Sequence, residues 1–404
     1  MAQENIKTRF LIISDTHGAK LYDEADSVRQ YDSDDSGDSQ PPEGTVINGF
    51  RRPLPKADVA IHCGDLTKGS GVKEFETTFN LMREIDAPLK LVIAGNHDMA
   101  LDTAFWETYV QWMEGGQKAR KAEYPAKAYE VVERARQDGI HLLDEGTYHF
   151  VLHNGAKLSV FASHWTPVYG GWGFQYRGRH DFPIPEGVDL AMTHGPPKYI
   201  LDRTLFGAKA GCKYLLESIS RARPRMHCFG HIHEGWGAKL VTWKDKDREE
   251  IPTAPSAWGM TSALDLPQSP PTVDEQLSSV IADLAAVDIN AYETPTRVEN
   301  LERANKLAEE RCASVSLCVG DAVTLQQGRQ TLFVNAAIMN ISYKPYQLPW
   351  LVDLELPPPD AGHIAKTEAT TAILQKDRRL SKPGDTSREA VFKGKLGSAY
   401  KHLA

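Results

Sequence analysis

Short apolar runs that end in polar residues recur along the chain. Four of them are Phe10–Ile13, Val59–Ile61, Leu91–Ala94 and Met226–Phe229, and Leu190–Met192 is a shorter fifth. Continuous apolar runs of this length predict strands that are buried on both faces. Such strands belong to sheets that other layers cover, so the pattern favours an α/β fold.

Apolar residues at helical spacing separate the early strands. A helix is predicted between Ser70 and Ala87, and another over 126–137. The residues that define the face of the first helix are Val72, Phe75, Phe79, Met82 and Ile85. The order of strand, helix and strand is typical of α/β units. Periodicity alone does not decide between one doubly wound sheet and two stacked sheets.

The pattern changes after residue 243. A strand is predicted over 238–243, followed by a charged turn to 250 and a Pro-rich stretch to 271. Two helices are predicted next, the second of them from about 295 to 312. The first would carry on one face Leu277, Val280, Ile281 and Leu284. We interpret 244–328 as a mainly helical insertion.

Two further strand-like runs, 331–337 and 349–355, follow the insertion. We expect both to belong to one sheet, the second of the core. From 358 to 404 the chain is rich in Lys and Ser and has no sustained apolar period. This composition predicts a partly disordered C-terminal tail. The predicted core therefore comprises residues 1–243 and 329–357.

The net charge of −8 is concentrated in one segment. Residues 22–44 contain eight acids and one Arg, a local sum of −7, so the rest of the chain is nearly neutral. We interpret 27–45 as an acidic mobile loop, which is either a solvated insertion or a lid over a site. No run of five Lys or Arg residues occurs, which argues against a nucleic-acid polymer or a membrane surface as a partner.

Other features of composition indicate an intracellular, cytoplasmic protein. No run of eighteen apolar residues occurs, and the first nine residues lack the apolar stretch of a signal peptide. The five cysteines are odd in number and form no C-x-x-C pair, so they are predicted to be reduced thiols.

Polar residues with metal-binding chemistry follow all five apolar runs. The segments are Asp15-Thr16-His17, Gly64-Asp65, Gly95-Asn96-His97-Asp98, Thr193-His194-Gly195 and Gly230-His231-Ile232-His233. Because ligands bind at the carboxyl ends of strands in open α/β sheets, we expect these side chains to meet at one rim. Imidazole combined with carboxylate and amide oxygen suits manganese, iron or zinc better than calcium. The number of ligands implies two divalent ions.

In this order the segments resemble the motifs of the calcineurin-like metallophosphoesterase superfamily. The resemblance implies a four-layer α/β/β/α sandwich of two mixed sheets, here with the helical insertion. It also implies hydrolysis of a phosphate ester by a hydroxide that bridges two ions. The implied ligands are Asp15, His17 and His233 for the first ion, Asn96, His194 and His231 for the second, and Asp65 between them.

The resemblance also suggests roles beside the ligands. His97 would contact the phosphate and protonate the leaving oxygen, although a histidine that orients a metal-bound carboxylate is an alternative. Asp98 would support the loop. His62 would support the metal shell or, as a simpler reading, would be a satisfied core histidine.

Residues around the motifs indicate which branch of the superfamily the chain resembles. Leu66–Ser70 follows Gly64-Asp65 without the Arg of the serine/threonine phosphatases or the Tyr of the purple acid phosphatases. Ser163–Pro167, Gly171–Phe174 and Thr193–Pro197 are similar to the branch of metallophosphoesterase-domain (MPPED) proteins. This similarity implies a phosphodiesterase acting on small substrates such as cyclic nucleotides.

The aromatic stretch from Trp165 to Arg179 offers substrate contacts, for which Trp165 and Arg177 are candidates, although aromatics that pack on the sheet fit equally well. Three other functions stay open. One is a phosphomonoesterase acting on a small metabolite. Another is a nucleotide-binding regulator with little turnover, against which the presence of His194, His231 and His233 argues. The third is a scaffold that binds protein through 244–328 and the tail.

Overall fold

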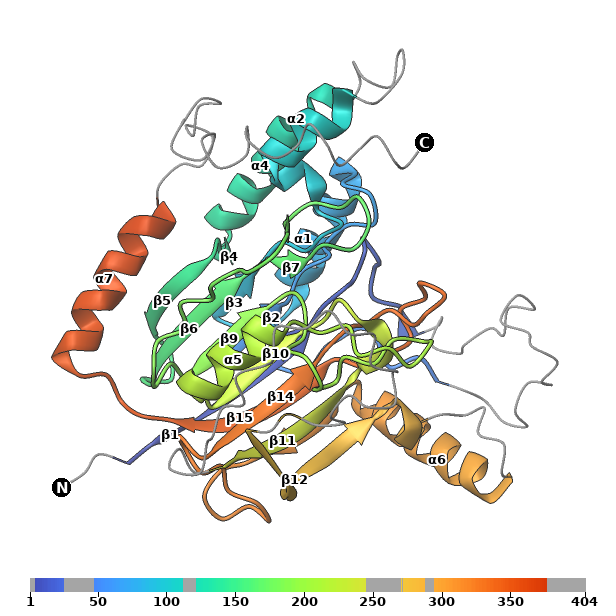
Figure 1. The fold of residues 1–404 in the computed structure, drawn as a ribbon, viewed down its shortest axis with the longest axis vertical. Coiled ribbons are helices and arrows are strands. Elements are labelled where there is room, and N and C mark those ends of the chain that lie inside the picture. The colour runs from blue at the N-terminus through green and yellow to red at the C-terminus, as the bar shows by residue number, and fades with distance from the viewer. Residues whose placement is uncertain are drawn as a thin grey trace, which may run out of the picture.

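The structure is a computed structural model, and it describes residues 4–24, 47–111, 121–244, 270, 272–287 and 294–375 (Figure 1). The predicted acidic loop 27–45 lies outside the described residues, as does the part of the predicted tail beyond 375. The prediction of each therefore stays a prediction.

One mixed sheet has six strands in the order β13-β15-β1-β2-β3-β4. The strands are β1 (Ile6–Ile13), β2 (Val59–His62), β3 (Leu89–Val92), β4 (Ile140–Leu142), β13 (Ala313–Ser316) and β15 (Trp350–Leu356). Strands β1, β2, β3 and β4 are parallel, so β1, β2 and β3 all end at the same edge. Three of the apolar runs predicted from the sequence are these strands.

The other mixed sheet has seven strands in the order β12-β11-β14-β10-β9-β6-β5. They are β5 (Gly146–Val151), β6 (Lys157–Ser163), β9 (Leu190–Thr193), β10 (Met226–Phe229), β11 (Gly237–Trp243), β12 (Val273–Asp283) and β14 (Gln330–Asn335). Strands β6, β9, β10 and β14 are parallel. A two-stranded ribbon of β7 (Thr166–Pro167) and β8 (Gln175–Tyr176) accompanies them.

Alternate side chains of each strand face different cores, which defines four layers. Phe10 and Ile12 pack against the facing sheet, whereas Leu11 packs against helices. In the seven-stranded sheet, Phe161 faces the opposite way and packs with Ile219. The helices of the outer layers are α1 (Val72–Glu84), α2 (Thr103–Gln111) and α4 (Tyr124–Gln137) on one side and α5 (Lys213–Ala222) on the other. The expected sandwich and the predicted helices α1 and α4 are thereby confirmed.

The first helix predicted for the insertion is wrong. Residues 273–283 form β12, an edge strand that pairs antiparallel with β11. Of the four residues that suggested a helical face, Leu277 and Val280 are 56% and 55% exposed, whereas Ile281 and Leu284 pack against the core. The second predicted helix is present as α6 (Thr294–Glu310). Strands β12 and β13 both lie within 244–328 but belong to different sheets. The division of the chain into a core and an insertion therefore stays a prediction.

One further expectation about the C-terminal part needs correction. Strands β14 and β15 belong to different sheets, because β14 pairs with β10 whereas β15 pairs with β1. The tail begins with helix α7 (Ala361–Gln375), which lies beside the edge strand β5 (Figure 1). Its two buried side chains are polar, so an apolar period could not reveal it. Thr370 Oγ1 accepts a 2.9 Å hydrogen bond from the His149 amide, and the His363 ring bonds to the Phe150 carbonyl. Among the described residues, no helix combines the length and apolarity needed for a membrane span.

Candidate metal centre

Sharp turns at the strand ends position the predicted ligands. Asp15 follows β1, Asp65 follows β2, His194 follows β9 and His231 follows β10. Three of these, Asp15, Asp65 and His231, have positive φ angles of 53°, 54° and 68°, and His17 has 46°. Non-glycine residues rarely adopt this left-handed conformation, and such strain clusters at functional sites. The turns bring side chains from both sheets together at one rim.

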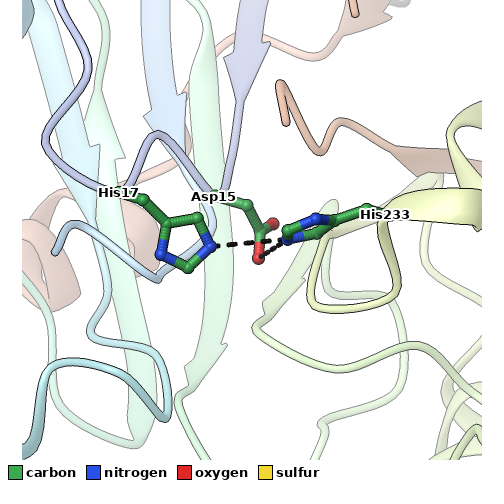
Figure 2. Close-up of side chains that lie close together, drawn as sticks. All are labelled: Asp15, His17 and His233. Atoms are coloured by element: carbon green, nitrogen blue, oxygen red, sulfur yellow. Dashed lines mark hydrogen bonds and ion pairs between the residues drawn. The ribbon is translucent and has the colours of Figure 1, made fainter. Parts of the chain in front are cut away.

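The first group of side chains consists of Asp15, His17 and His233 (Figure 2). One ligand atom from each lies within 4.8 Å of the others. The Nε2 atoms of His17 and His233 are 3.4 Å apart, and His233 Nε2 lies 3.5 Å from Asp15 Oδ1. All three residues are buried. They could hold one metal ion.

The second group consists of Asp65, His194 and His231, again with ligand atoms within 4.8 Å. Asn96 Oδ1 adjoins it, 2.9 Å from His194 Nε2. The two carboxylate oxygens of Asp65 reach both groups: Oδ1 lies 3.4 Å from His194 Nε2, and Oδ2 lies 3.8 Å from His17 Nε2. Asp65 therefore lies between the two groups of side chains, with one carboxylate oxygen toward each.

Backbone carbonyls set the tautomers of the histidines. His17 Nδ1 lies 2.9 Å from the Thr67 carbonyl, and His194 Nδ1 lies 2.9 Å from the Cys63 carbonyl. Because a carbonyl only accepts, each Nδ1 carries a hydrogen, and Nε2 is the nitrogen left for a metal. The Nε2 atoms of His17 and His233 also face one another, at 3.4 Å. This donor set fits divalent ions of the manganese, iron or zinc type.

Burial and charge have opposite effects on the ionisable groups of the site. Burial opposes ionisation of the two aspartates, but nearby imidazoles outweigh it, lowering the pKa of Asp15 to about 2 and holding that of Asp65 well below its usual range. Burial lowers the pKa of His17 and of His231 to about 4. For His194 burial is outweighed by the charge of Asp65, which raises the pKa to about 9. A metal at His194 would therefore displace a proton.

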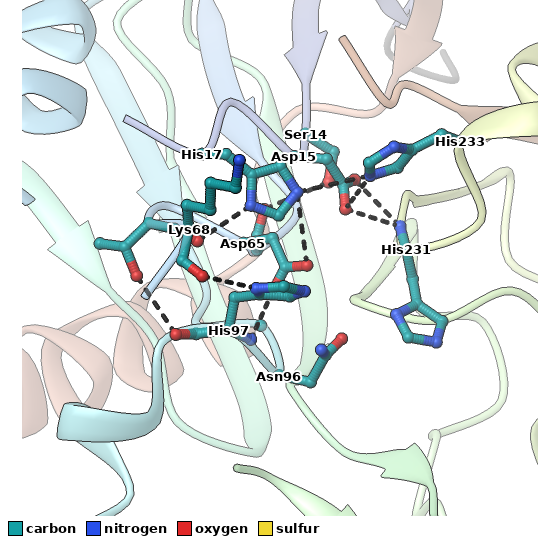
Figure 3. Close-up of polar contacts among 12 residues, drawn as sticks. Ser14, Asp15, His17, Asp65, Lys68, Asn96, His97, His231 and His233 are labelled. Carbon is teal, nitrogen blue, oxygen red and sulfur yellow. Dashed lines mark hydrogen bonds and ion pairs between the residues drawn. The ribbon is translucent and has the colours of Figure 1, made fainter. Parts of the chain in front are cut away.

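His97 lies at the edge of the first group (Figure 3). One of its ring nitrogens is within 4.8 Å of ligand atoms of His17 and Asp65. Its Nδ1 lies 2.8 Å from the Lys68 carbonyl, and its ring stacks on Trp172 with centroids 4.1 Å apart. The contact with the Asp65 carboxylate comes from the His97 backbone amide, at 2.8 Å. The imidazole itself is not needed to orient that carboxylate.

Two buried residues brace the loops. The Asp98 carboxylate accepts hydrogen bonds from the amides of Leu66, Thr67 and Gly95 at 2.8–3.0 Å, which ties the loop after β2 to the loop after β3. His62 Nε2 lies 2.8 Å from Thr16 Oγ1, within the turn that carries Asp15 and His17. Both residues act on the loops and lie outside the two ligand groups.

The aromatic residues beside the site differ from those named from the sequence. The Trp165 ring contacts His164, Phe174 and His180, and Arg177 is exposed, so their substrate roles stay predictions. Trp172, in the same aromatic stretch, is the residue that stacks on His97.

Sequence reasoning missed Tyr343, whose ring lies 5.0 Å from that of His17 and 5.3 Å from that of His233. No motif marks Tyr343, and the fold alone brings it near the ligands.

Known proteins resemble about half of the chain. Human metallophosphoesterase domain-containing protein 1 is 34% identical over 191 residues, covering 46% of this chain and 56% of that protein. Probable rhamnogalacturonate lyase C of Emericella nidulans is 33% identical over 213 residues, or 51% of this chain and 18% of the relative. The chain thus spans about half the length of the former and less of the latter.

A structural likeness to the purple acid phosphatase PPD1 of yellow lupin (Lupinus luteus) has a TM-score of 0.31 at 10% identity and covers 61% of this chain and 41% of that one. A family model described as calcineurin-like phosphoesterase matches residues 8–235, more than half of the chain and all seven predicted ligands. The chain therefore belongs to the calcineurin-like phosphoesterase family.

Proposed function

We propose that the protein is a metal-dependent phosphoric ester hydrolase with a site for two divalent ions, of manganese, iron or zinc. The observation that carries the proposal is the position of Asp65, whose two oxygens reach both groups of ligands. Bound ions would attract the phosphate and lower the pKa of a shared water. The residues that would hold them are Asp15, His17 and His233 for one ion, Asn96, His194 and His231 for the other, and Asp65 for both.

His97 would contact the phosphate and protonate the leaving oxygen. The carbonyl of Lys68 engages Nδ1, so the other ring nitrogen is the one left for the substrate. In the proposed step, a proton on this nitrogen moves to the oxygen of the departing alcohol as the P–O bond breaks. The alternative role, orientation of a metal-bound carboxylate, has less support because the His97 backbone amide already makes that contact.

We further propose a small phosphodiester, such as a cyclic nucleotide, as the substrate. The rings of Trp172 and Tyr343 lie beside His97 and His17 and could pack against a nucleoside. A phosphomonoesterase is the second candidate, because the ammonium group of Lys68 near Tyr343 would also suit the extra negative charge of a monoester.

Metal-stripped protein, reloaded with manganese, tests this proposal. We expect metal-dependent release of p-nitrophenol from bis(p-nitrophenyl) phosphate, faster than from the monoester and at least 100-fold slower in Asp65→Asn. Turnover of Asp65→Asn within a fewfold of wild type would contradict the site. Turnover of the monoester alone would identify the second candidate, and nucleotide binding without turnover would identify a regulator.

The His97→Asn variant tests the acid role. p-Nitrophenolate leaves without much help from a proton, whereas an alkoxide does not. We therefore expect the variant to lose roughly 100-fold or more on a diester with an alkoxide leaving group, but less on the nitrophenyl diester, with metal content unchanged. Equal losses on both esters would exclude proton donation.

A further inference from the structure

Lys68 is an exposed cation at the rim of the metal centre. Its side chain is exposed, and no described carboxylate forms an ion pair with it. Glu74, in the first turn of α1, directs its oxygens to backbone amides instead: Lys68 and Gly69 at 3.3 Å and Gly71 at 2.7 Å. The ammonium group of Lys68 is therefore available to an anion.

An aromatic ring holds this ammonium group beside the ligands. Lys68 Nζ lies 5.0 Å from the centroid of the Tyr343 ring, within the range of a cation–π interaction. The same ring contacts the imidazoles of His17 and His233, at 5.0 Å and 5.3 Å between centroids. Figure 3 shows the Lys68 side chain running alongside His17. The cation is thus close to where a metal-bound phosphate would lie.

The turn that carries Tyr343 is anchored to the metal centre. The side-chain oxygen of Asn340 accepts hydrogen bonds from the amides of Ser342 and Lys344, at 3.0 Å and 2.9 Å. The carbonyl of Asn340 lies 3.3 Å from His233 Nδ1. Tyr343 itself has a φ of 55°, a conformation that an aromatic residue adopts at an energetic cost. The turn that holds this strained conformation is hydrogen-bonded to His233, a candidate metal ligand. Strain in such a place indicates a functional position.

The backbone of Lys68 belongs to an equally well-anchored loop. Its carbonyl lies 2.8 Å from His97 Nδ1, and the neighbouring Ser70 hydroxyl donates to the His97 carbonyl at 3.0 Å. Thr67 donates its amide to the Asp98 carboxylate at 2.9 Å. The residue that carries the cation and the candidate acid His97 are therefore held by one hydrogen-bonded unit.

We infer that Lys68 and Tyr343 form an oxyanion-binding subsite, in which the Lys68 ammonium group contacts a non-bridging oxygen of the substrate phosphate and Tyr343 holds that ammonium group in place. The inference rests on the proposed function, because it places a phosphate at the metal centre. Because Tyr343 already restricts the Lys68 side chain, less conformational freedom is lost when an anion binds. Among the described residues, no carboxylate pairs with Lys68 and competes with that anion.

The subsite is tested with inorganic phosphate as the probe and with protein that is loaded with manganese and freed of excess metal. We expect Lys68→Met to weaken phosphate binding in calorimetry by about 10- to 100-fold and to raise KM for bis(p-nitrophenyl) phosphate, as loss of a charged hydrogen bond predicts. Lys68→Arg should restore part of the affinity. Tyr343→Leu should weaken binding, and Tyr343→Phe, which keeps the ring, should weaken it less.

Lys73→Met is the matched control, because Lys73 is also exposed, lies five residues away and has no contact with the metal centre. It should stay within twofold of wild type, with metal content equal in all variants. Phosphate binding by Lys68→Met within twofold of wild type would overturn the subsite.

The two proposals fail separately. If turnover depends on metal and Asp65, but neither turnover nor phosphate binding depends on Lys68, the proposed function stands and the subsite is refuted. Phosphate binding that requires Lys68, in a protein without metal-dependent turnover, supports the subsite and removes the hydrolase.

Discussion

Glycines at the strand ends allow the ligand loops to approach one another. A β-carbon on Gly230 would lie 1.9 Å from Asp15 Oδ2 and 2.2 Å from Ser14 Oγ. One on Gly95 would lie 2.2 Å from the amide nitrogen of Asp65. Real side chains do not approach this closely, so the backbone at these positions packs directly against metal-binding carboxylates.

Gly230→Ala should therefore displace Asp15 and lower metal content. We expect the variant to lose most of the first ion and at least tenfold in turnover, as measured by elemental analysis and by hydrolysis of bis(p-nitrophenyl) phosphate. Gly171→Ala is the control, because its added carbon would meet no heavy atom within 4 Å. Full metal loading of Gly230→Ala would show that the loop adjusts.

A buried histidine away from the ligands predicts acid sensitivity. Thr193 Oγ1 donates to the Gly195 carbonyl, so His227 Nε2 must donate to that hydroxyl at 2.8 Å. His227 Nδ1 is then a bare, buried nitrogen with no partner among the described residues. Burial lowers the pKa of His227 to about 3 from an ordinary 6.5. The folded state therefore disfavours a proton that the unfolded chain accepts.

The stability that neutral His227 contributes to the folded state is fully present above pH 6.5 and is lost as pH falls toward 3. Between pH 6.5 and 5 it amounts to about 2 kcal/mol of unfolding free energy. We expect His227→Gln, which has no titrating group, to lose correspondingly less stability over this range in urea unfolding. Parallel pH profiles for variant and wild type would refute the assignment.

At the scale of elements, helix α7 covers the outer strand of the seven-stranded sheet. Uncovered edge strands invite pairing with other chains, and helices that lie beside them prevent it. Here the attachment is polar, through His363 and Thr370, both buried. The hydrogen bonds of these two side chains with β5, more than an apolar face, specify where α7 lies.

Removing both contacts should loosen α7. We expect the double variant His363→Ala and Thr370→Val to lose roughly 1–3 kcal/mol in unfolding free energy, because each buried hydrogen bond contributes about 1 kcal/mol. Thr371→Val is a suitable control, since Thr371 is exposed and bonds only within the helix, to the Thr367 carbonyl. Equal stability of the double variant and this control would mean that α7 is held in another way.

At the scale of the whole molecule, the metal centre joins the two sheets. Asp15, His17, Asp65 and Asn96 follow strands of the six-stranded sheet, whereas His194, His231 and His233 follow strands of the other. Without metal, the buried His194 takes up a proton and the rings of His17 and His233 face one another. Ions that bind ligands of both sheets would relieve these contacts and link the sheets.

Metal should consequently stabilise the entire fold. At a free metal concentration of 100 Kd, each ion adds about 2.7 kcal/mol, so manganese should raise the melting temperature of stripped protein by several degrees. Asp65→Asn should show a much smaller rise, which differential scanning calorimetry with and without EDTA would measure. A full rise in that variant would exclude Asp65 as the shared ligand.

Much of the fold and the ligand set could be predicted because their signals are local. A strand run followed by polar residues, as at Phe10–Ile13 and Asp15, is visible in a few neighbouring positions. The errors arose where local patterns are ambiguous or partners are distant. Leu277 and Val280 had helical spacing but lie in an edge strand, and the strand-like runs β14 and β15 belong to different sheets.

The sequence by itself determined the chemistry of the ligands, the strands that deliver them and the membership of the family, because each depends on residue type and short spacing. Only the tertiary structure decided that β14 and β15 join different sheets and that Tyr343 lies against His17 and His233. These are contacts between segments about a hundred or more residues apart, and no local pattern encodes them. The same holds for Lys68, which becomes a candidate for phosphate binding through the ring that the fold places beside it.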